Sequence, residues 1–261
     1  MRAAIVIPCR YGSTRFPGKP LATIAGRSLV ERVWRVGKAV AGVDHVVVAT
    51  DDKRIADHVQ SFGGTAVMTS EACQNGSERA FEAVEKLNQK IDIIVNLQGD
   101  TPLTPPWTIE ALITEMRRDP AVQLSTPAVQ LSREELDRLV DARTRGIVGG
   151  TTVVFDKNHN AFYFSKNIIP YTRTLPATGP TPVYRHVGLY AYTHQTLKRY
   201  VELPESTLEK IEQLEQLRAL ENGIPIRVVP VDFRGRTSWS VDNPSDVGEV
   251  ERIIAAEGEL I

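Results

Sequence analysis

The densest group of chemically active side chains follows the first apolar segment of the chain. Residues 10–20 read Arg-Tyr-Gly-Ser-Thr-Arg-Phe-Pro-Gly-Lys-Pro, with three cations and two glycines among them. Glycines let a backbone approach an anion closely, while arginine and lysine neutralise its charge. The spacing matches neither a P-loop nor a dinucleotide-binding fingerprint. The segment is therefore either an exposed basic loop or a site for a triphosphate.

Two aspartates are candidates for holding a divalent cation beside that loop. Asp100 ends the segment 96–100, Asn-Leu-Gln-Gly-Asp, and Asp242 lies in the segment 241–244, Val-Asp-Asn-Pro. A carboxylate at the end of a strand is well placed to hold Mg²⁺ against phosphate oxygens. Each aspartate also has a structural alternative, because Asp100 could start a turn or cap the next helix, and Asp242 could cap the helix that follows it.

Further polar side chains stand in two other regions. Residues 73–79, Cys-Gln-Asn-Gly-Ser-Glu-Arg, form a polar turn that opens a helix, and its free amides and arginine could contact a nucleotide. A second set could bind a carboxylated, hydroxyl-rich ligand, since arginine pairs with carboxylates and Glu and Gln bind hydroxyls; it consists of Lys166, Arg173, Arg185, His186, Tyr190, Glu215 and Gln216. Taken singly, His186 is also typical of a buried structural histidine, and Glu215 of a solvated charge on an amphipathic helix.

The elements that must position these residues alternate between strand and helix in the first half of the chain. Apolar runs predict strands at 3–8, 45–50, 65–68 and 91–97, and amphipathic spacing predicts helices at 28–40, 51–62 and 77–87. Ser28 and Glu31 have the spacing of a capping box. This order predicts a mostly parallel sheet with helices on both faces, which binds ligands at the carboxyl ends of its strands.

The second half has a different pattern. It predicts strands at 151–155, 161–164, 186–192 and 226–231, a helix over 208–220 that Gly223 closes, and a last helix at 244–256. Between the strands, residues 170–182 are rich in Pro, Thr and Gly. We interpret this region as strands with an excursion that could pair with a second subunit.

Composition limits the function classes. The chain has 261 residues, with 31 Lys and Arg against 32 Asp and Glu, and this near-neutral balance argues against a nucleic-acid binder that works through bulk positive charge. Two cysteines, Cys9 and Cys73, are too few for a disulfide-stapled scaffold or a zinc ribbon. No apolar run approaches the roughly 18 residues of a membrane helix. We expect a single cytoplasmic domain over residues 1–261, with no membrane partner.

Eight stretches spread over nearly the whole chain resemble the 3-deoxy-manno-octulosonate cytidylyltransferases, or CMP-Kdo synthetases, within the sugar nucleotidyltransferases. They cover residues 7–21, 48–52, 74–79, 95–100, 163–166 with 169–170, 185–190, 214–218 and 241–244. The first stretch is the most specific. The resemblance implies an α/β nucleotide-diphospho-sugar transferase (GT-A-like) fold with a mixed, mostly parallel sheet. It also implies a strand-rich, dimerising arm on the sugar side at about 128–195.

The resemblance implies an activity as well. The enzyme would transfer CMP from CTP to the anomeric hydroxyl of a 3-deoxy-2-ulosonic acid, Kdo, with Mg²⁺, and release pyrophosphate for surface-glycan (lipopolysaccharide) synthesis. By resemblance the catalytic residues are Arg10, Lys19, Asp100 and Asp242, of which the two aspartates bind the metal. The implied nucleotide-binding residues are Cys9, Arg10, Gly12, Arg15, Lys19, Gln74, Asn75, Gly76, Arg79 and Gln98. The implied sugar-binding residues are Lys166, Arg173, His186, Tyr190, Glu215 and Gln216.

Several positions depart from the family pattern. Thr101 replaces a glutamate, Lys166 replaces an arginine, Ser240 replaces a glycine, and a lysine usual near residues 146–152 is absent. Some of these changes lie where the sugar is expected to bind. Two alternatives therefore stand beside Kdo activation: CMP transfer to another acidic sugar, such as 8-amino-Kdo or a sialic-acid-like sugar, and a catalytically silent nucleotide-binding paralogue.

Overall fold

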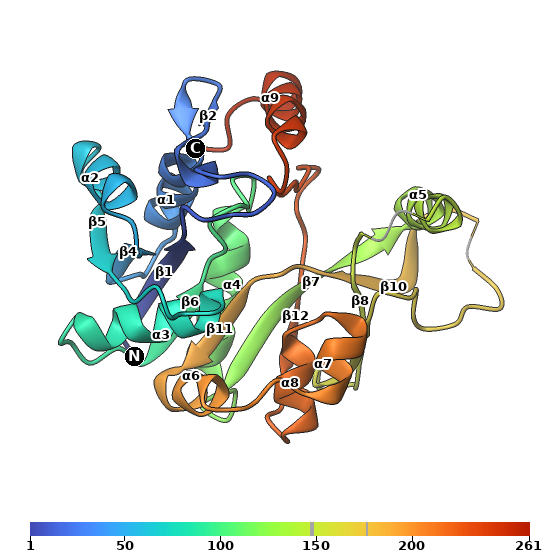
Figure 1. Ribbon diagram of the computed structural model, residues 1–261. Helices are drawn as coiled ribbons and strands as arrows, with labels where there is room; N and C mark the ends of the chain where they lie inside the picture. The colour runs from blue at the N-terminus through green and yellow to red at the C-terminus, as the bar shows by residue number, and fades with distance from the viewer. Residues whose placement is uncertain (147–148, 176) are drawn as a thin grey trace.

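A mixed sheet of ten strands forms the centre of the protein. The computed structural model describes residues 1–146, 149–175 and 177–261. The sheet has the order β5-β4-β1-β6-β11-β7-β10-β8-β9, with β12 beside β7 (Figure 1). Its strands are β1 (Ala3–Cys9), β4 (His45–Thr50), β5 (Thr65–Met68), β6 (Ile93–Asn96), β7 (Leu124–Ser132), β8 (Thr152–Phe155), β9 (Ala161–Ser165), β10 (Pro180–His186), β11 (Tyr190–Thr193) and β12 (Arg227–Val231). A small hairpin joins β2 (Thr23–Ile24) and β3 (Arg27–Ser28).

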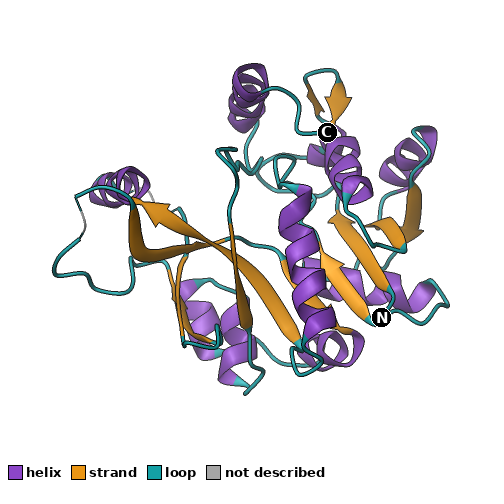
Figure 2. Cartoon of the chain, turned by 180° about the vertical axis from the view of Figure 1, so that it is seen from behind, coloured by secondary structure: helices purple, strands orange, loops and turns teal. Residues whose placement is uncertain are grey.

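Helices cover both faces of this sheet (Figures 1 and 2). They are η1 (Lys19–Leu21), α1 (Leu29–Ala39), α2 (Lys53–Ser61), α3 (Gly76–Lys86), α4 (Pro106–Arg118), α5 (Arg133–Thr144), α6 (His194–Val201), α7 (Thr207–Glu212), α8 (Gln216–Glu221) and α9 (Ser245–Glu257). Side chains of β1 alternate between two cores, since Ile5 and Ile7 pack with α1, α2, α4 and α9, while Ala4 and Val6 pack with α3, α6 and α8. The predicted α/β architecture is confirmed.

The first half of the chain builds the parallel part of the sheet. Strands β5, β4, β1 and β6 run parallel, as the alternation of apolar runs and amphipathic helices predicts. Their carboxyl ends lie at one edge, where residues 10, 51 and 97 leave the sheet. The polar segments that follow β1 and β6 are thereby brought side by side.

The second half adds the antiparallel strands. Here β11, β7, β10, β8 and β9 pair antiparallel, and β12 returns parallel to β7. Helix α5 covers the far ends of β7 and β10 through a small separate core of Leu131, Leu136 and Val183 (Figure 1). The predicted excursion at 170–182 and the missing family lysine near 146–152 fall partly on residues 176 and 147–148, which lie outside the described residues.

Two predicted elements are wrong in their extent. The strand predicted at 186–192 is two strands, because His186 ends β10 and a turn at 187–189 moves the chain across β7 to start β11 at Tyr190. The excursion also ends earlier than predicted, since β10 begins at Pro180 and pairs with Ser132 of β7. Both differences arise from pairing with distant strands, which local periodicity does not report.

Two local predictions also need correction. The helix predicted over 208–220 is interrupted between α7 and α8, where Gln213 adopts a left-handed conformation with φ 53°. The capping box at Ser28 is half formed: Ser28 Oγ accepts the Glu31 amide, but the Glu31 carboxylate pairs with Arg35.

Within the described part of the chain, no helix has the length and apolarity needed to cross a bilayer.

Candidate active site

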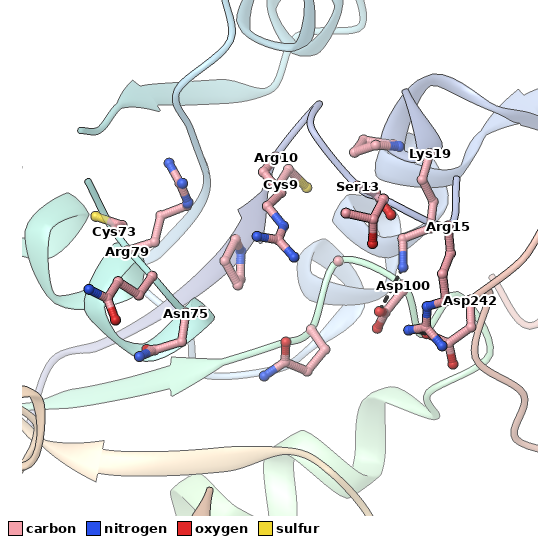
Figure 3. A pocket seen from close by; sticks show the side chains of 17 residues that line it. Cys9, Arg10, Ser13, Arg15, Lys19, Cys73, Asn75, Arg79, Asp100 and Asp242 are labelled. Atoms are coloured by element: carbon pink, nitrogen blue, oxygen red, sulfur yellow. Dashed lines mark hydrogen bonds and ion pairs between the residues drawn. The ribbon is translucent and has the colours of Figure 1, made fainter. Parts of the chain in front are cut away.

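A polar cleft of about 390 Å³ lies at the carboxyl ends of β1 and β6 (Figure 3). The structure brings together there most residues predicted to bind nucleotide or metal, namely Cys9, Arg10, Arg15, Lys19, Gln74, Asn75, Gly76, Arg79, Gln98, Asp100 and Asp242. Gly12 belongs to the same loop but does not line the cleft. Ser13 and Thr14 line it as well, although neither was predicted to bind nucleotide. The basic segment after β1 is therefore part of a cleft and not an isolated surface loop.

The basic loop is held in shape by Tyr11. Its carbonyl accepts the amides of Ser13 at 2.9 Å and Gly18 at 3.0 Å, which closes the loop at its base. Gly18 has φ 71°, and a Cβ there would lie 3.2 Å from the Tyr11 ring, so the loop requires glycine at this position. The Arg54 guanidinium stacks 3.4 Å from the ring centroid and pairs with Asp52. Arg54 could not be identified from the sequence, because nothing local connects α2 to this loop.

The acidic end of the cleft joins the two ends of the chain. Lys19 Nζ donates to Asp100 Oδ2 at 2.9 Å and to the Val241 carbonyl at 2.8 Å. Arg15 pairs with Asp242 at 2.7 Å, and the Val241 amide donates to the Asp100 carbonyl at 2.8 Å. Two ion pairs, each of one cation and one carboxylate, thus stand at this end of the cleft (Figure 3).

The helix-cap alternatives for the two aspartates are wrong, although Asp100 does lie in a turn, where the Thr101 amide donates to the Gln98 carbonyl at 3.3 Å. Helix α9 starts at Ser245, and the carboxylate that accepts the amides of residues 242 and 243 belongs to Asp246. Asp100 does not cap α4, which starts at Pro106. Both carboxylates instead line the cleft, where their oxygens are available to a ligand.

The same two carboxylates are suited to magnesium. Across the described residues, no group of three or more His, Cys, Asp or Glu side chains is placed to hold a metal ion by itself. Mg²⁺ is usually bound by one or two carboxylates together with substrate phosphates and waters. Asp100 and Asp242 in a cleft rich in cations fit that ligand set, with a phosphate supplying the remaining oxygens.

The turn before α3 forms the other end of the cleft (Figure 3). Asn75 caps α3 by accepting the Glu78 amide at 2.9 Å. Arg79 is almost fully buried and donates to Asp51 at 2.6 Å and Thr69 at 2.6 Å. Asp51 is not among the predicted site residues, although its place directly after β4, at the same sheet edge, is the sequence signal that indicates it. Asp51 fixes the guanidinium of Arg79 at the wall of the cleft.

Glycine is required where β6 leaves the sheet. A Cβ at Gly99 would lie 2.6 Å from the Pro8 carbonyl oxygen and 2.9 Å from Cys9 Sγ. A side chain at position 99 would therefore push the segment that carries Gln98 and Asp100 away from β1.

The two cysteines of the cleft are not suited to nucleophilic chemistry. Burial raises the pKa of the Cys9 thiol to about 12. Burial and a hydrogen bond to Glu82 raise the pKa of Cys73 to about 11. Both side chains stay protonated near neutral pH and are poor nucleophiles, because the thiolate is the reactive form.

Four of the predicted sugar-binding residues lie close together outside the lining of this cleft. Tyr190 donates to Gln216 Oε1 at 2.9 Å, and the Tyr190 ring lies 5.7 Å from the ring of His186. Tyr190 of β11 pairs with Asn96 of β6. Asn96 lies two residues before Gln98, which lines the cleft. The buried Gln216 Nε2 has no partner among the described residues, which leaves a donor free for a ligand.

Two members of this cluster, His186 and Glu215, have pKa values that burial shifts in opposite directions. Burial lowers the pKa of His186 to about 3, so the ring is neutral, and its Nε2 lies 2.8 Å from Thr126 Oγ1. His186 can exchange a hydrogen bond with a ligand but cannot pair with a carboxylate as a cation. Burial raises the pKa of Glu215 to about 7, against the opposing charge of Arg218, so this residue is not the solvated charge of the structural alternative.

The other two predicted sugar-binding residues stand apart. Lys166 is positioned through its backbone amide, which donates to Glu212 at 2.9 Å. Arg173 lies exposed on the excursion after β9. In the described part of the chain, no hydrogen bond or ion pair joins either side chain to the cluster of residues 186, 190, 215 and 216.

The sequence matches known proteins over its full length. Residues 4–226 match the family model described as cytidylyltransferase. The chain is 56% identical over 261 residues to 3-deoxy-manno-octulosonate cytidylyltransferase of Maricaulis maris, covering 100% of both chains. It is 39% identical to the mitochondrial 3-deoxy-manno-octulosonate cytidylyltransferase of Arabidopsis thaliana, covering 97% of this chain and 83% of that protein.

Solved structures give the same result. The fold is similar to that of a CMP:2-keto-3-deoxy-manno-octonic acid synthetase complexed with CTP, with a TM-score of 0.85, 39% identity, and coverage of 98% of this chain and 100% of the other. An inositol-1-phosphate CTP transferase from T. maritima shares the fold alone, with a TM-score of 0.62 at 18% identity, over 98% of this chain and 95% of the other.

Proposed function

Because the chain belongs to the 3-deoxy-manno-octulosonate cytidylyltransferase family, we propose that it transfers CMP from CTP to the anomeric hydroxyl of Kdo and releases pyrophosphate. One observation carries the proposal. Arg10 and Lys19 from the start of the chain, Asp100 from its middle and Asp242 from near its end line one cleft with the polar turn before α3.

The cleft supports a division of roles. At one end Arg10, Arg15 and Lys19 offer cations to a triphosphate, and at the other the turn at 74–76 and Arg79 offer donors to the nucleoside. The sugar hydroxyl attacks the α-phosphorus in line, the bond from that phosphorus to the bridging oxygen breaks, and the hydroxyl proton passes to water. Charge develops on phosphoryl oxygens, so fixed cations and positioning supply most of the catalysis.

Asp100 and Asp242 would hold Mg²⁺ beside those oxygens. When bound, the metal would neutralise phosphate charge and make the sugar hydroxyl easier to deprotonate. Lys19 keeps Asp100 in place through their 2.9 Å ion pair, and Arg15 does the same for Asp242. The Lys19 bond to the Val241 carbonyl brings the two carboxylate-bearing segments together.

We assign sugar recognition to the cluster of His186, Tyr190, Glu215 and Gln216, supported by its free Gln216 donor and its place beside β6. Lys166 and Arg173 would supply the cations that bind the sugar carboxylate. We also propose that the protein is a cytoplasmic homodimer, in which α5 and the excursion form the contact. The exposed ring of Tyr171 on that excursion supports this assignment.

The test is magnesium-dependent pyrophosphate release with CTP and a panel of Kdo, 8-amino-Kdo and N-acetylneuraminate. Release with Kdo alone is the expected result, and UTP and ATP serve as nucleotide controls. Asp100→Asn is expected to lose turnover while CTP still binds, whereas Lys53→Ala, on the exposed face of α2, keeps full activity. Release with another acid alone would change the sugar assignment. No release with any acid, despite CTP binding, would support a silent paralogue.

A further inference from the structure

A second cavity, of about 680 Å³, lies on the opposite side of β10 from the sugar cluster. Helix α5, the end of β7, Arg185 of β10 and the segment 232–239 line it. Successive strand side chains point to opposite faces, so Arg185 faces α5 while its neighbour His186 packs against Phe164. This cavity takes no part in the proposed reaction.

Arg185 is the unusual residue of this cavity. Its Nε is fully buried, and no described residue accepts a hydrogen bond from its guanidinium. Burial lowers the pKa of Arg185, and Glu135 is the acid that opposes this effect. A buried Nε without an acceptor costs free energy, which an anion in the cavity would offset while it also accepts from the half-exposed terminal nitrogens.

The acids that line the cavity are engaged by other groups. Glu135 Oε2 accepts the Ser132 amide at 2.8 Å as part of the capping box of α5, and Asp232 Oδ1 accepts the Arg234 amide at 2.6 Å. Arg138 adds an exposed cation to the cavity lining. The cavity therefore offers hydrogen-bond donors that its own carboxylates do not accept.

We propose that this cavity is a binding site for an oxyanion, a carboxylate or a phosphate, held by the Arg185 guanidinium and separate from the CTP cleft. Guanidinium binds such groups through two parallel hydrogen bonds. Trp239 lines the cavity and lies three residues before Asp242, so a ligand here contacts the segment that carries an active-site carboxylate. Occupancy of the cavity fixes that segment.

Calorimetric titration of the CTP-saturated protein with inorganic phosphate and, separately, with acetate tests the site, because CTP fills the other cleft. We expect saturable binding to the wild type, with the tighter anion identifying the ligand class. Arg185→Gln should weaken it at least tenfold, and Arg185→Lys should weaken it less, since charge without the planar fork is retained. The matched control Arg252→Gln, exposed on α9 and outside the cavity lining, should bind within about twofold of wild type.

Equal binding by the wild type and Arg185→Gln, or no saturable binding by the wild type, would overturn the proposal. Crystals soaked in tungstate give a second measurement that does not depend on any variant folding. Anomalous density beside Arg185, as well as at the basic loop of Arg10 and Lys19, is expected. Density at the basic loop alone contradicts the site.

Discussion

The carboxyl group of Glu215 makes the free energy of unfolding depend on pH. Burial raises its pKa from 4.5 to about 7, and repulsion from Glu209 adds to this, while the charge of Arg218 and a hydrogen bond from Ser77 act in the opposite direction. The folded protein therefore holds a proton on Glu215 at pH values where the unfolded chain has lost it. This contribution to stability is fully present below pH 4.5 and is lost as the pH rises through about 7.

Glu215→Gln removes that titration. We expect the wild type to lose about 1–3 kcal/mol of unfolding free energy, relative to the variant, between pH 5 and pH 8. Urea unfolding of both proteins at four pH values measures it, and the histidines and other groups cancel because they titrate in both. A difference between the two proteins that does not change with pH would show that Glu215 is ionised throughout.

At the scale of elements, the break between α7 and α8 depends on one backbone conformation. Gln213 has φ 53°, which is unfavourable for a residue with a side chain. The break is held by Glu209, whose carboxylate accepts the Ser206 amide and pairs with Arg218 at 2.6 Å. It turns α8 so that Leu217 reaches the core while Gln216 faces Tyr190.

Substitutions at Gln213 should follow backbone preference. Gln213→Gly should leave the unfolding free energy unchanged or raise it by up to about 1 kcal/mol, because relief of the left-handed strain exceeds the added freedom of the unfolded chain. Gln213→Val should lower it by about 1–2 kcal/mol, since a β-branched residue fits this region poorly. Denaturant unfolding of the three proteins ranks them. If valine is tolerated as well as glycine, the break does not depend on this conformation.

Patterns in the sequence predicted those strands and helices whose positions depend on neighbouring residues in the chain. The parallel strands β1, β4, β5 and β6 and their helices follow from apolar runs and amphipathic spacing. The break at Gln213 was not predictable, because leucines recur every three residues straight through it. Nor was the step from β10 to β11, since it is set by pairing with β7, whose residues lie some sixty positions earlier in the chain.

The same distinction holds for the site. Arg10 and Asp100 follow strand ends that sequence patterns locate, and Lys19 belongs to the basic segment after the first of them, so their meeting in one cleft could be predicted. The stacking of Arg54 on Tyr11 and the buried pair of Asp51 with Arg79 were not predicted, because each joins side chains from separate elements whose contact no local pattern reports. The role of Asp242 as cap or ligand was left open by sequence, and the position of Asp246 decides against the cap.

For the whole molecule, the cleft connects the two ends of the chain. The segment after β12 crosses the molecule to α9 (Figure 2), and on the way it places Val241 against Lys19 and Asp242 against Arg15. Arg32 of α1 pairs with Glu259 beyond α9, which fixes the end of this segment to the first half of the fold. A ligand in the cleft therefore stabilises contacts between segments that lie far apart in the chain.

CTP should accordingly raise the melting temperature, and magnesium should enlarge the effect. At a hundredfold excess over its Kd, CTP is expected to add about 2.7 kcal/mol, or roughly 5–10 °C for a chain of this size. EDTA should remove part of that shift in the wild type, because on the proposed assignment Asp100 and Asp242 would hold the metal beside the phosphates. Asp242→Asn should show the smaller shift with or without EDTA, while Asp57→Asn, exposed on α2, should behave as wild type. If EDTA leaves the CTP-induced shift in melting temperature of the wild type unchanged, the magnesium assignment is refuted. If EDTA reduces the shift of Asp242→Asn as much as that of the wild type, Asp100 alone remains as the protein ligand.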